Sequence, residues 1–225
     1  MFANKVVLVT GGSSGIGAAT VELFAKERAS VAFVGRNEVK LKEVASRCEQ
    51  YGANTFIIKA DVSKEEEAKT IVQQTVDKFG KLDVLVNNAG ILRFASILQP
   101  NLLQNYDEVI NTNLRPVIHI TNLAGNIINV SSMAGISTTR TLNIAYRTSK
   151  AAMNHFTRSA ALELATHGVR VNTISPGPVR TDIFEEQKVD LEKMQNNTAL
   201  GRLSEPSEIA DMILSPSHVF MKEHK

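Results

Sequence analysis

The sequence TGGSSGIG occupies residues 10–17, between an apolar run at residues 6–9 and a segment with helical periodicity. Its glycines follow the spacing Gly-x₃-Gly-x-Gly from Gly11. They permit a tight turn and let the backbone approach a pyrophosphate, which then lies on the N-terminus of the following helix. A glycine-rich turn without a ligand is the alternative. Because the strand–loop–helix context that the motif requires is present, the sequence favours a nucleotide-binding loop.

Short apolar runs alternate with longer amphipathic segments along the whole chain. The runs are residues 6–9, 31–34, 55–58, 82–86, 127–130 and 169–174. They are rich in β-branched residues and apolar on both faces, as expected of parallel strands covered by helices on both sides. We therefore predict an α/β fold: one doubly wound parallel sheet of the Rossmann type in three layers, forming a single domain over residues 1–225. Ligands of such sheets bind at the carboxyl ends of the strands, where the strand order reverses.

Helix ends are also visible in the sequence. Ser63 and Glu66 have the spacing of a capping box ahead of a helix that reaches Phe79. Gly52, Gly80 and Gly168 each follow a helical segment, where a left-handed residue commonly ends the helix.

Composition excludes several classes of protein. The formal charge is +2, with Lys and Arg scattered, so nucleic-acid binding is not expected. The five His residues are dispersed and Cys48 is the single cysteine, so we expect neither disulfides nor a metal site. No apolar run approaches the roughly 20 residues of a membrane span. A predicted strand begins by Lys5, which leaves no room for a signal peptide. We therefore expect a soluble cytoplasmic protein without a membrane partner.

Tyr146 and Lys150 are four residues apart, a spacing that places two side chains on one face of a helix. A neighbouring cation favours the phenolate and would lower the pKa of the tyrosine from about 10. Tyr146 is thus a candidate proton donor for carbonyl chemistry. An ordinary pair on a helix surface is the alternative reading, and the spacing alone does not decide between them.

Six ordered motifs together make the chain resemble the short-chain dehydrogenase/reductase family in its single-domain branch, which includes 3-oxoacyl-[acyl-carrier-protein] reductases and related carbonyl reductases. They are TGGSSGIG; Asp61-Val62 after the third run; Asn87-Asn88-Ala89-Gly90 after the fourth; Asn113 in the sequence NLRP, with Pro116 where the family usually has Gly; Ser131-Ser132 followed by Tyr146 and Lys150; and Pro176-Gly177 with Val179 and Thr181. They span residues 5 to about 210.

The resemblance implies a set of site residues. Tyr146 would exchange a proton with the substrate oxygen, Ser132 would orient that oxygen, and Lys150 would act on Tyr146 and hold the nicotinamide ribose. Asn113 would hold a water that links Lys150 to solvent. Ser131 competes for the role of Ser132, which we prefer because Ser132 begins the family's Ser-x-x-Gly pattern. The implied cofactor-binding residues are Gly11, Ser13, Ser14, Gly15, Ile16, Gly17, Arg36, Asn37, Asp61, Val62, Asn87, Ala89, Gly90, Tyr146, Lys150, Pro176, Gly177, Val179 and Thr181.

The end of the second apolar run bears on the choice of cofactor. NAD enzymes commonly place an acidic residue there, whereas a nearby Arg suits the 2′-phosphate of NADP. Here Gly35 occupies that position and Arg36 follows it, ahead of Asn37. The sequence therefore favours NADP(H) over NAD(H). The alternative is that Arg36 is simply a solvated residue at the start of a helix.

Two segments depart from the family pattern. The predicted helix over residues 105–123 is about two turns short before the next strand, which puts in doubt the homodimer or homotetramer that the resemblance implies. Near the end, Ser215-Pro216-Ser217 is expected to break the last helix. The apolar run at residues 219–221 is too short for a good closing strand, so the last strand is possibly missing. Either the sequence lacks pieces of a longer protein, which we favour, or the chain is a shortened variant.

Substrate recognition is expected from the loops at residues 92–98, 136–144 and 182–198. Their apolar residues Phe94, Ile97, Leu142, Ile144, Ile183 and Phe184 suggest a moderately apolar substrate, although such side chains are more often packing. The leading hypothesis is an NADP(H)-dependent oxidoreductase acting on a ketone or secondary alcohol. The alternative is a cofactor-binding family member without turnover, acting as a sensor or interaction module. An epimerase or dehydratase of the extended branch is disfavoured because no substrate domain follows.

Overall fold

A six-stranded parallel sheet forms the centre of the computed structural model, which describes residues 2–121, 125–138, 142–185 and 187–218. The strands are β1 (Val6–Thr10), β2 (Ser30–Gly35), β3 (Thr55–Lys59), β4 (Val84–Asn87), β5 (Asn126–Val130) and β6 (Arg170–Ile174). Their order across the sheet is β3-β2-β1-β4-β5-β6, and every neighbouring pair is parallel. The predicted doubly wound sheet is confirmed. The described residues contain no seventh strand, and residues 219–221 lie outside them.

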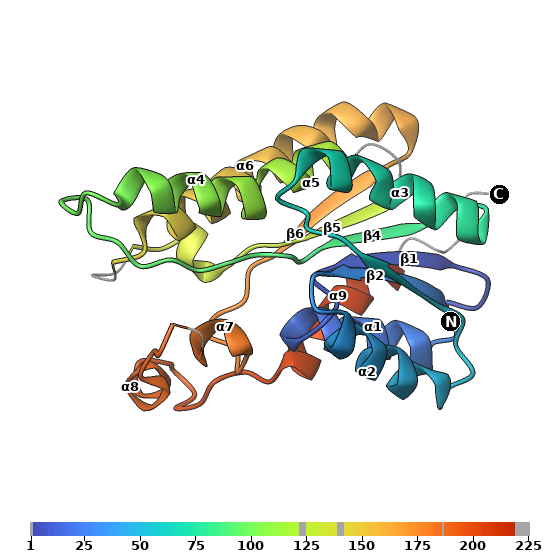
Figure 1. The fold of residues 1–225 in the computed structure, drawn as a ribbon, viewed down its shortest axis with the longest axis horizontal. Helices are drawn as coiled ribbons and strands as arrows, with labels where there is room; N and C mark the ends of the chain where they lie inside the picture. Colours follow the sequence, from blue (N-terminus) through green and yellow to red (C-terminus); the bar gives the residue numbers. More distant parts are fainter. Residues whose placement is uncertain (1, 122–124, 139–141, 186, 219–225) are drawn as a thin grey trace.

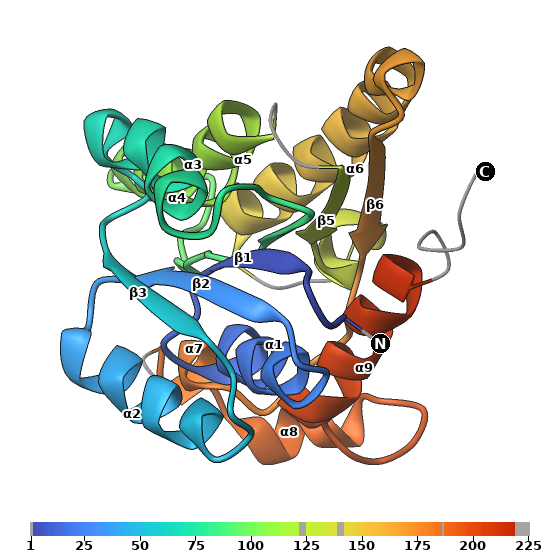
Figure 2. The same cartoon turned by 90° about the vertical axis from the view of Figure 1, so that its right-hand side faces the viewer.

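Helices cover both faces of the sheet (Figures 1 and 2). One layer contains α1 (Gly15–Lys26), α2 (Glu38–Glu49) and α9 (Pro206–His218), and the other contains α3 (Glu65–Phe79), α4 (Leu102–Asn113), α5 (Arg115–Ile120) and α6 (Ile144–Leu164). Alternation along β1 supplies both layers with apolar contacts: Val7 and Val9 pack in one hydrophobic cluster and Leu8 in the other. Because β1 is buried on both faces, its sequence is continuously apolar.

The strand order reverses between β1 and β4. β2 and β3 lie on one side of β1, whereas β4, β5 and β6 lie on the other. Val9 of β1 is in register with Val86 of β4, so the two strands end side by side. The loops that follow them, which carry TGGSSGIG and Asn87-Asn88-Ala89-Gly90, therefore meet at the switch point where ligands of doubly wound sheets bind.

The glycines mark chain reversals as predicted. Gly80 is the left-handed C-cap of α3, with φ 82°, and Gly168 is that of the short helix η2 (Ala165–His167), with φ 70°. Gly52, two residues beyond the C-cap of α2, has φ 67°. A residue with a side chain would be strained at these backbone angles.

The predicted capping box of Ser63 and Glu66 is wrong. The backbone N–H and the hydroxyl of Ser63 both donate to Oδ1 of Asp61, at 3.0 and 2.7 Å, so the serine closes a local turn instead. Lys64 is the N-cap of α3 and makes no side-chain cap. Glu67, rather than Glu66, reaches back to accept the backbone N–H of Asp61 at 2.7 Å.

The segment predicted as one helix over residues 105–123 forms α4 and α5, which are separated at Leu114. The backbone of Leu114, with φ −120° and ψ −52°, interrupts the helix. Pro116 lies in the first turn of α5, where its missing N–H leaves no helical hydrogen bond unmade. Residues 122–124, part of the connection to β5, lie outside the described residues.

The predicted break at Ser215-Pro216-Ser217 is also wrong, because α9 continues through Pro216 to His218. Proline removes one helical hydrogen bond. Other contacts satisfy the surrounding groups: the Ser217 hydroxyl donates to the Ile213 carbonyl at 2.8 Å, and Arg170 donates to the Pro216 carbonyl at 3.3 Å. Contacts with the start of β6 thus hold a turn that local propensity disfavours.

None of the described helices is both long and apolar enough to cross a bilayer. Within the same part of the chain, His, Cys, Asp and Glu side chains do not gather in groups of three or more that could hold a metal ion.

Candidate active site

A cavity of about 1720 Å³ opens at the carboxyl ends of the strands. The predicted residues on its wall are Gly11, Ser13, Ser14, Gly15, Ile16, Arg36, Asn37, Asp61, Val62, Ala89, Gly90, Ser132, Tyr146, Lys150, Pro176, Gly177, Val179 and Thr181. The fold therefore brings together side chains that are spread over most of the sequence. Three predicted residues, Gly17, Asn87 and Asn113, are not on this wall. Each of the three is buried beside it.

The loop at residues 10–17 is packed so closely that its glycines cannot carry side chains. A Cβ at Gly17 would overlap the carbonyl oxygen of Gly11 and lie 2.5 Å from Nδ2 of Asn88. Gly15 has φ 53°, and a Cβ there would lie 2.9 Å from Thr181. The loop thus presents bare backbone to the cavity ahead of α1, which is the arrangement that a pyrophosphate requires. The site fits a dinucleotide cofactor.

Asn88 holds this loop against the end of β4. Its side-chain amide donates to the carbonyl oxygens of Thr10 and Gly11, at 3.0 and 3.2 Å, while its backbone N–H donates to the Thr10 hydroxyl at 3.0 Å. Asn87 instead points into the sheet, where its amide donates to Oδ1 of Asn129 at 2.9 Å. The sequence pattern contains both asparagines, but only their alternation at the strand end distinguishes the cavity-lining residue, Asn88, from the buried one.

At the end of β2, Arg36 and Asn37 lie on the cavity wall. The Asn37 side chain caps α2 by accepting the Lys40 backbone N–H at 3.1 Å. Arg36 reaches toward Asp61 after β3, with Nη1 4.0 Å from Oδ2. Lys40, which sequence reasoning missed, lines the same part of the cavity. The wall is therefore rich in charge at the edge of β2.

The two candidate serines after β5 have different partners. Ser131 is buried, and its hydroxyl donates to the backbone carbonyl of Lys150 at 3.1 Å. Ser132 is the N-cap of the short helix η1 (Met133–Gly135) and lies within hydrogen-bonding reach of Tyr146. Both serines line the cavity, but Ser132 is the one whose side chain contacts the phenol of Tyr146.

Tyr146 and Lys150 lie one turn apart on α6, as their spacing predicts. The ammonium Nζ of Lys150 is 5.7 Å from the centre of the Tyr146 ring and donates to the Val130 carbonyl at 2.7 Å. Burial raises the pKa of Tyr146, and the hydrogen bond with Ser132 opposes that increase only in part. The net shift of the Tyr146 pKa is therefore opposite in direction to the expected lowering, because removal of the phenol from water outweighs its polar contacts.

Gly135, the last residue of the Ser-x-x-Gly pattern, lies against the helix that carries Tyr146 and Lys150. A Cβ at Gly135 would lie 2.6 Å from the carbonyl carbon of Lys150 and 2.7 Å from the backbone nitrogen of Ala151. The helix η1 thus packs directly on the backbone of α6. This close approach fixes the position of Ser132 relative to Tyr146.

The side chain of Asn113 joins two segments of the site. Its Oδ1 accepts the Ile91 backbone N–H at 2.8 Å, and its amide donates to the Ile91 carbonyl at 3.0 Å and to the Ser149 hydroxyl at 3.2 Å. Ser149 in turn donates to the Tyr146 carbonyl at 2.7 Å. Asn113 thereby connects the loop after β4 to the first turns of α6. Its predicted water contact with Lys150 stays a prediction.

Lys150 gives a prediction about stability and pH. Burial lowers its pKa from 10.5 to about 8. In the unfolded chain the Lys150 ammonium keeps its proton up to about pH 10.4. Between a pH of about 8 and about 10.4 the unfolded chain therefore binds more protons than the folded chain. The free energy of unfolding of the wild type should therefore rise, relative to Lys150→Met, as the pH increases from about 8 toward about 10.4. Thermal melts across this range measure the difference. A stability difference between the wild type and Lys150→Met that stays flat across this range would contradict the prediction.

Residues of α7 (Asp182–Glu185) and α8 (Leu191–Asn196) line the cavity. The two helices lie beyond the strand ends on the side of α1 and α2 (Figure 1). Of the apolar residues predicted to recognise substrate, Ile183 and Phe184 line the cavity. The other four, Phe94, Ile97, Leu142 and Ile144, are exposed to solvent and are not on its wall. Leu92, Val189 and Met194, which belong to the predicted loops 92–98 and 182–198, are also on the wall, whereas Met133 on the wall lies outside the three predicted loops.

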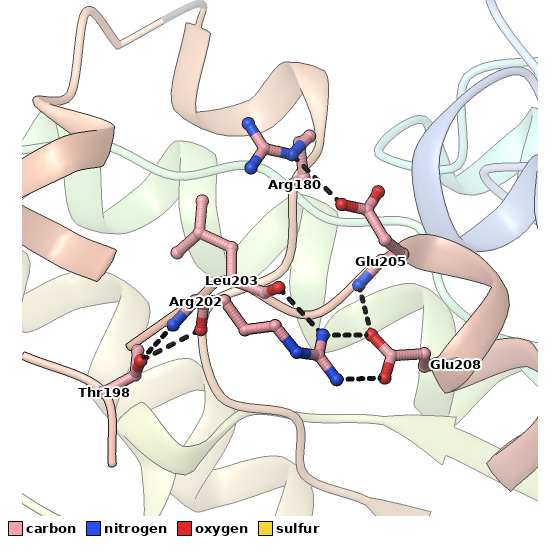
Figure 3. Close-up of polar contacts among 6 residues, drawn as sticks. All are labelled: Arg180, Thr198, Arg202, Leu203, Glu205 and Glu208. Atoms are coloured by element: carbon pink, nitrogen blue, oxygen red, sulfur yellow. Dashed lines mark hydrogen bonds and ion pairs between the residues drawn. The ribbon is translucent and has the colours of Figure 1, made fainter. Parts of the chain in front are cut away.

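The segment between α8 and α9 is held by a network of polar contacts (Figure 3). Arg202 pairs with Glu208 through two hydrogen bonds of 2.7 Å, and the backbone N–H of Arg202 donates to the Thr198 hydroxyl at 3.0 Å. Glu208 also accepts the backbone N–H of Glu205, whose carboxylate accepts from Arg180 at 3.1 Å. This network fixes the segment after α8 to the start of α9 and to the strand connection that carries Val179 and Thr181.

Comparison with known proteins agrees with this geometry. The model of the family described as short chain dehydrogenase matches residues 5–192. The chain belongs to the short chain dehydrogenase family. It is accordingly an NAD(P)-dependent oxidoreductase, as its named relatives in this family are dehydrogenases and reductases.

Relatives within the short chain dehydrogenase family cover nearly the whole chain. L-fucose dehydrogenase of Mus musculus is 35% identical, over 93% of this chain and 80% of its own length. The 3-oxoacyl-[acyl-carrier-protein] reductase of Thermotoga maritima is also 35% identical, over 94% of this chain and 89% of its own. Among solved structures, a short-chain type dehydrogenase/reductase from Mycobacterium marinum has a TM-score of 0.90 at 29% identity, covering 96% of this chain and 91% of that one.

Proposed function

We propose that the protein transfers a hydride between NADP(H) and a ketone or secondary alcohol. The observation that carries this proposal is the meeting of Ser132 and Tyr146 beside Lys150 in the cavity that also contains the glycine-rich loop. When bound, a nicotinamide cofactor supplies or accepts the hydride. Residues 1–225 would form one cofactor-binding domain.

The side chains would divide the remaining work. Ser132 would donate a hydrogen bond to the substrate oxygen, and such a contact can lower a barrier by roughly 3 kcal/mol. Tyr146 would give its hydroxyl proton to that oxygen during reduction and take it back during oxidation. Lys150, held by the Val130 carbonyl, would stabilise the charge left on the phenol. Asn113 would act with them through its contacts with Ile91 and Ser149.

The NADP(H) preference is supported by Arg36 and by the absence of an acidic side chain at Gly35. We expect Gly35→Asp with Arg36→Ile to shift the ratio of affinities toward NADH, because a carboxylate there would repel a 2′-phosphate and bind ribose hydroxyls. A Cβ at Gly35 would lie 3.2 Å from the Ser13 side chain, which can move by the small distance required. Calorimetric titration with both cofactors measures the ratio. An unchanged ratio would contradict the assignment of Arg36.

The location and assembly follow from the same proposal. Cys48 is buried and free. A free cysteine without disulfides is typical of a protein in a reducing compartment such as the cytoplasm. We also expect a homodimer or homotetramer, as the family resemblance implies, if the short connection after α5 permits the helical pairing.

The deciding experiment incubates the protein and NADPH with a panel of ketones, 3-oxoacyl thioesters and sugars, and follows the absorbance of the reduced cofactor. Oxidation of NADPH with one class of carbonyl supports the proposed function and names the substrate class. Binding of NADPH without oxidation across the panel favours the alternative, a cofactor-binding protein that acts as a sensor or interaction module.

A further inference from the structure

An ion pair on the cavity wall joins two residues that are 142 positions apart in sequence. Nζ of Lys40, in the first turn of α2, lies 2.6 Å from Oδ2 of Asp182, the first residue of α7. Both residues line the cavity, and both side chains are partly exposed to solvent. The pair therefore connects the edge of β2, where Arg36 lies, with α7.

A second pair has the same composition. Arg36 is 4.0 Å from Asp61 on the adjacent wall, with Asn37 between the two cations in the sequence. Arg36 and Lys40 thus each have a carboxylate neighbour from a different segment of the chain, Asp61 after β3 and Asp182 on α7. The two cations and two carboxylates sum to no net charge. An anionic ligand at this end of the cavity must compete with the carboxylates for the cations.

We propose that Lys40 is a second cationic ligand for the 2′-phosphate of the cofactor and that Asp182 weakens this binding by competing for Lys40. The inference rests on the proposed preference for NADP(H). A phosphate monoester carries a charge of about −1.5 to −2 at pH 7 and accepts strong hydrogen bonds. It therefore attracts the Lys40 ammonium more strongly than one carboxylate does, and it repels Asp182. Since the Lys40–Asp182 pair is partly exposed, its rearrangement costs little.

Calorimetric titration of single variants with NADPH and NADH tests the proposal, because it measures affinity without requiring turnover. Lys40→Gln should raise the Kd for NADPH about fivefold, as expected for loss of one partly exposed charge contact. Asp182→Asn should lower the Kd for NADPH about threefold, because it removes the competing charge. Both variants should bind NADH as the wild type does, within about twofold.

Lys42→Gln is the matched control, since Lys42 lies on the same helix, pairs with Glu38 at 2.8 Å and is not on the cavity wall. It should leave both affinities unchanged. Arg36→Leu separates the two proposals. If Arg36→Leu weakens NADPH binding selectively while Lys40→Gln does not, the role of Lys40 is wrong and the cofactor preference stands. If the wild type prefers NADH, both are overturned. A weaker affinity of Asp182→Asn for NADPH would show that Asp182 positions Lys40 rather than competing for it, which also overturns the inference.

Discussion

Tyr146→Phe is expected to lower the kcat for ketone reduction roughly a thousandfold, because the variant lacks the proton that Tyr146 would deliver to the substrate oxygen. The ring remains in its place on the cavity wall, so the affinity for NADPH and the melting temperature should change little. Steady-state kinetics with a carbonyl substrate identified from the panel measures the loss, and calorimetry measures the cofactor affinity.

The matched control is Tyr106→Phe, which removes a hydroxyl from α4 outside the cavity. It should retain wild-type kcat. Retained reduction by Tyr146→Phe with intact cofactor binding would exclude Tyr146 as the proton donor. The pH profile of kcat/KM gives a second measure of the role of Tyr146. Because burial raises the pKa of Tyr146, any ionisation of the phenol that limits the rate of the free enzyme should occur at a pH above the ordinary pKa of tyrosine.

Gly17→Ala is expected to weaken the binding of NADPH by up to roughly a hundredfold. Its Cβ would overlap the Gly11 carbonyl oxygen and press on the amide of Asn88, which holds the loop against β4. Overpacking of this kind costs about 1–3 kcal/mol, and a cost of about 3 kcal/mol placed on the bound form corresponds to roughly a hundredfold loss of affinity. Calorimetric titration with NADPH measures the loss, and thermal melts show how much of the strain falls on folding.

Gly177→Ala is the control for this substitution. Gly177 lines the same cavity, but a Cβ there would meet no atom within 4 Å. Its effect on stability should therefore be small. If Gly17→Ala bound NADPH as tightly as the wild type, the close packing of the loop would not be required for cofactor binding.

Much of the fold could be predicted from local sequence. The apolar runs have the length and composition of buried parallel strands, and all six strands form where those runs lie. The glycine-rich loop between β1 and α1 can be predicted because the spacing of its glycines indicates a tight turn with exposed backbone. Tyr146 and Lys150 share a helix face because a spacing of four residues fixes that geometry in any helix.

Errors arose where packing opposes local propensity. Local propensity predicts that a helix ends near Pro216, but the contacts of Arg170 and of the Ser217 hydroxyl support α9 through it. Ser63 has the spacing of a helix cap, but its hydroxyl and backbone N–H both donate to the carboxylate of Asp61. In both segments several conformations are locally acceptable, and neighbours distant in sequence or the details of a turn select one.

The sequence by itself determined the strand pattern, the cofactor loop and the residue types of the candidate catalytic group, because these depend on periodicity and on short spacings along the chain. Only the tertiary structure decided that Asn88 rather than Asn87 supports the loop, that Gly135 packs on the backbone of α6, and that Lys40 meets Asp182. Burial also decided the direction of the Tyr146 pKa. These features depend on which surfaces meet and how far water is excluded, and no local spacing in the chain specifies either.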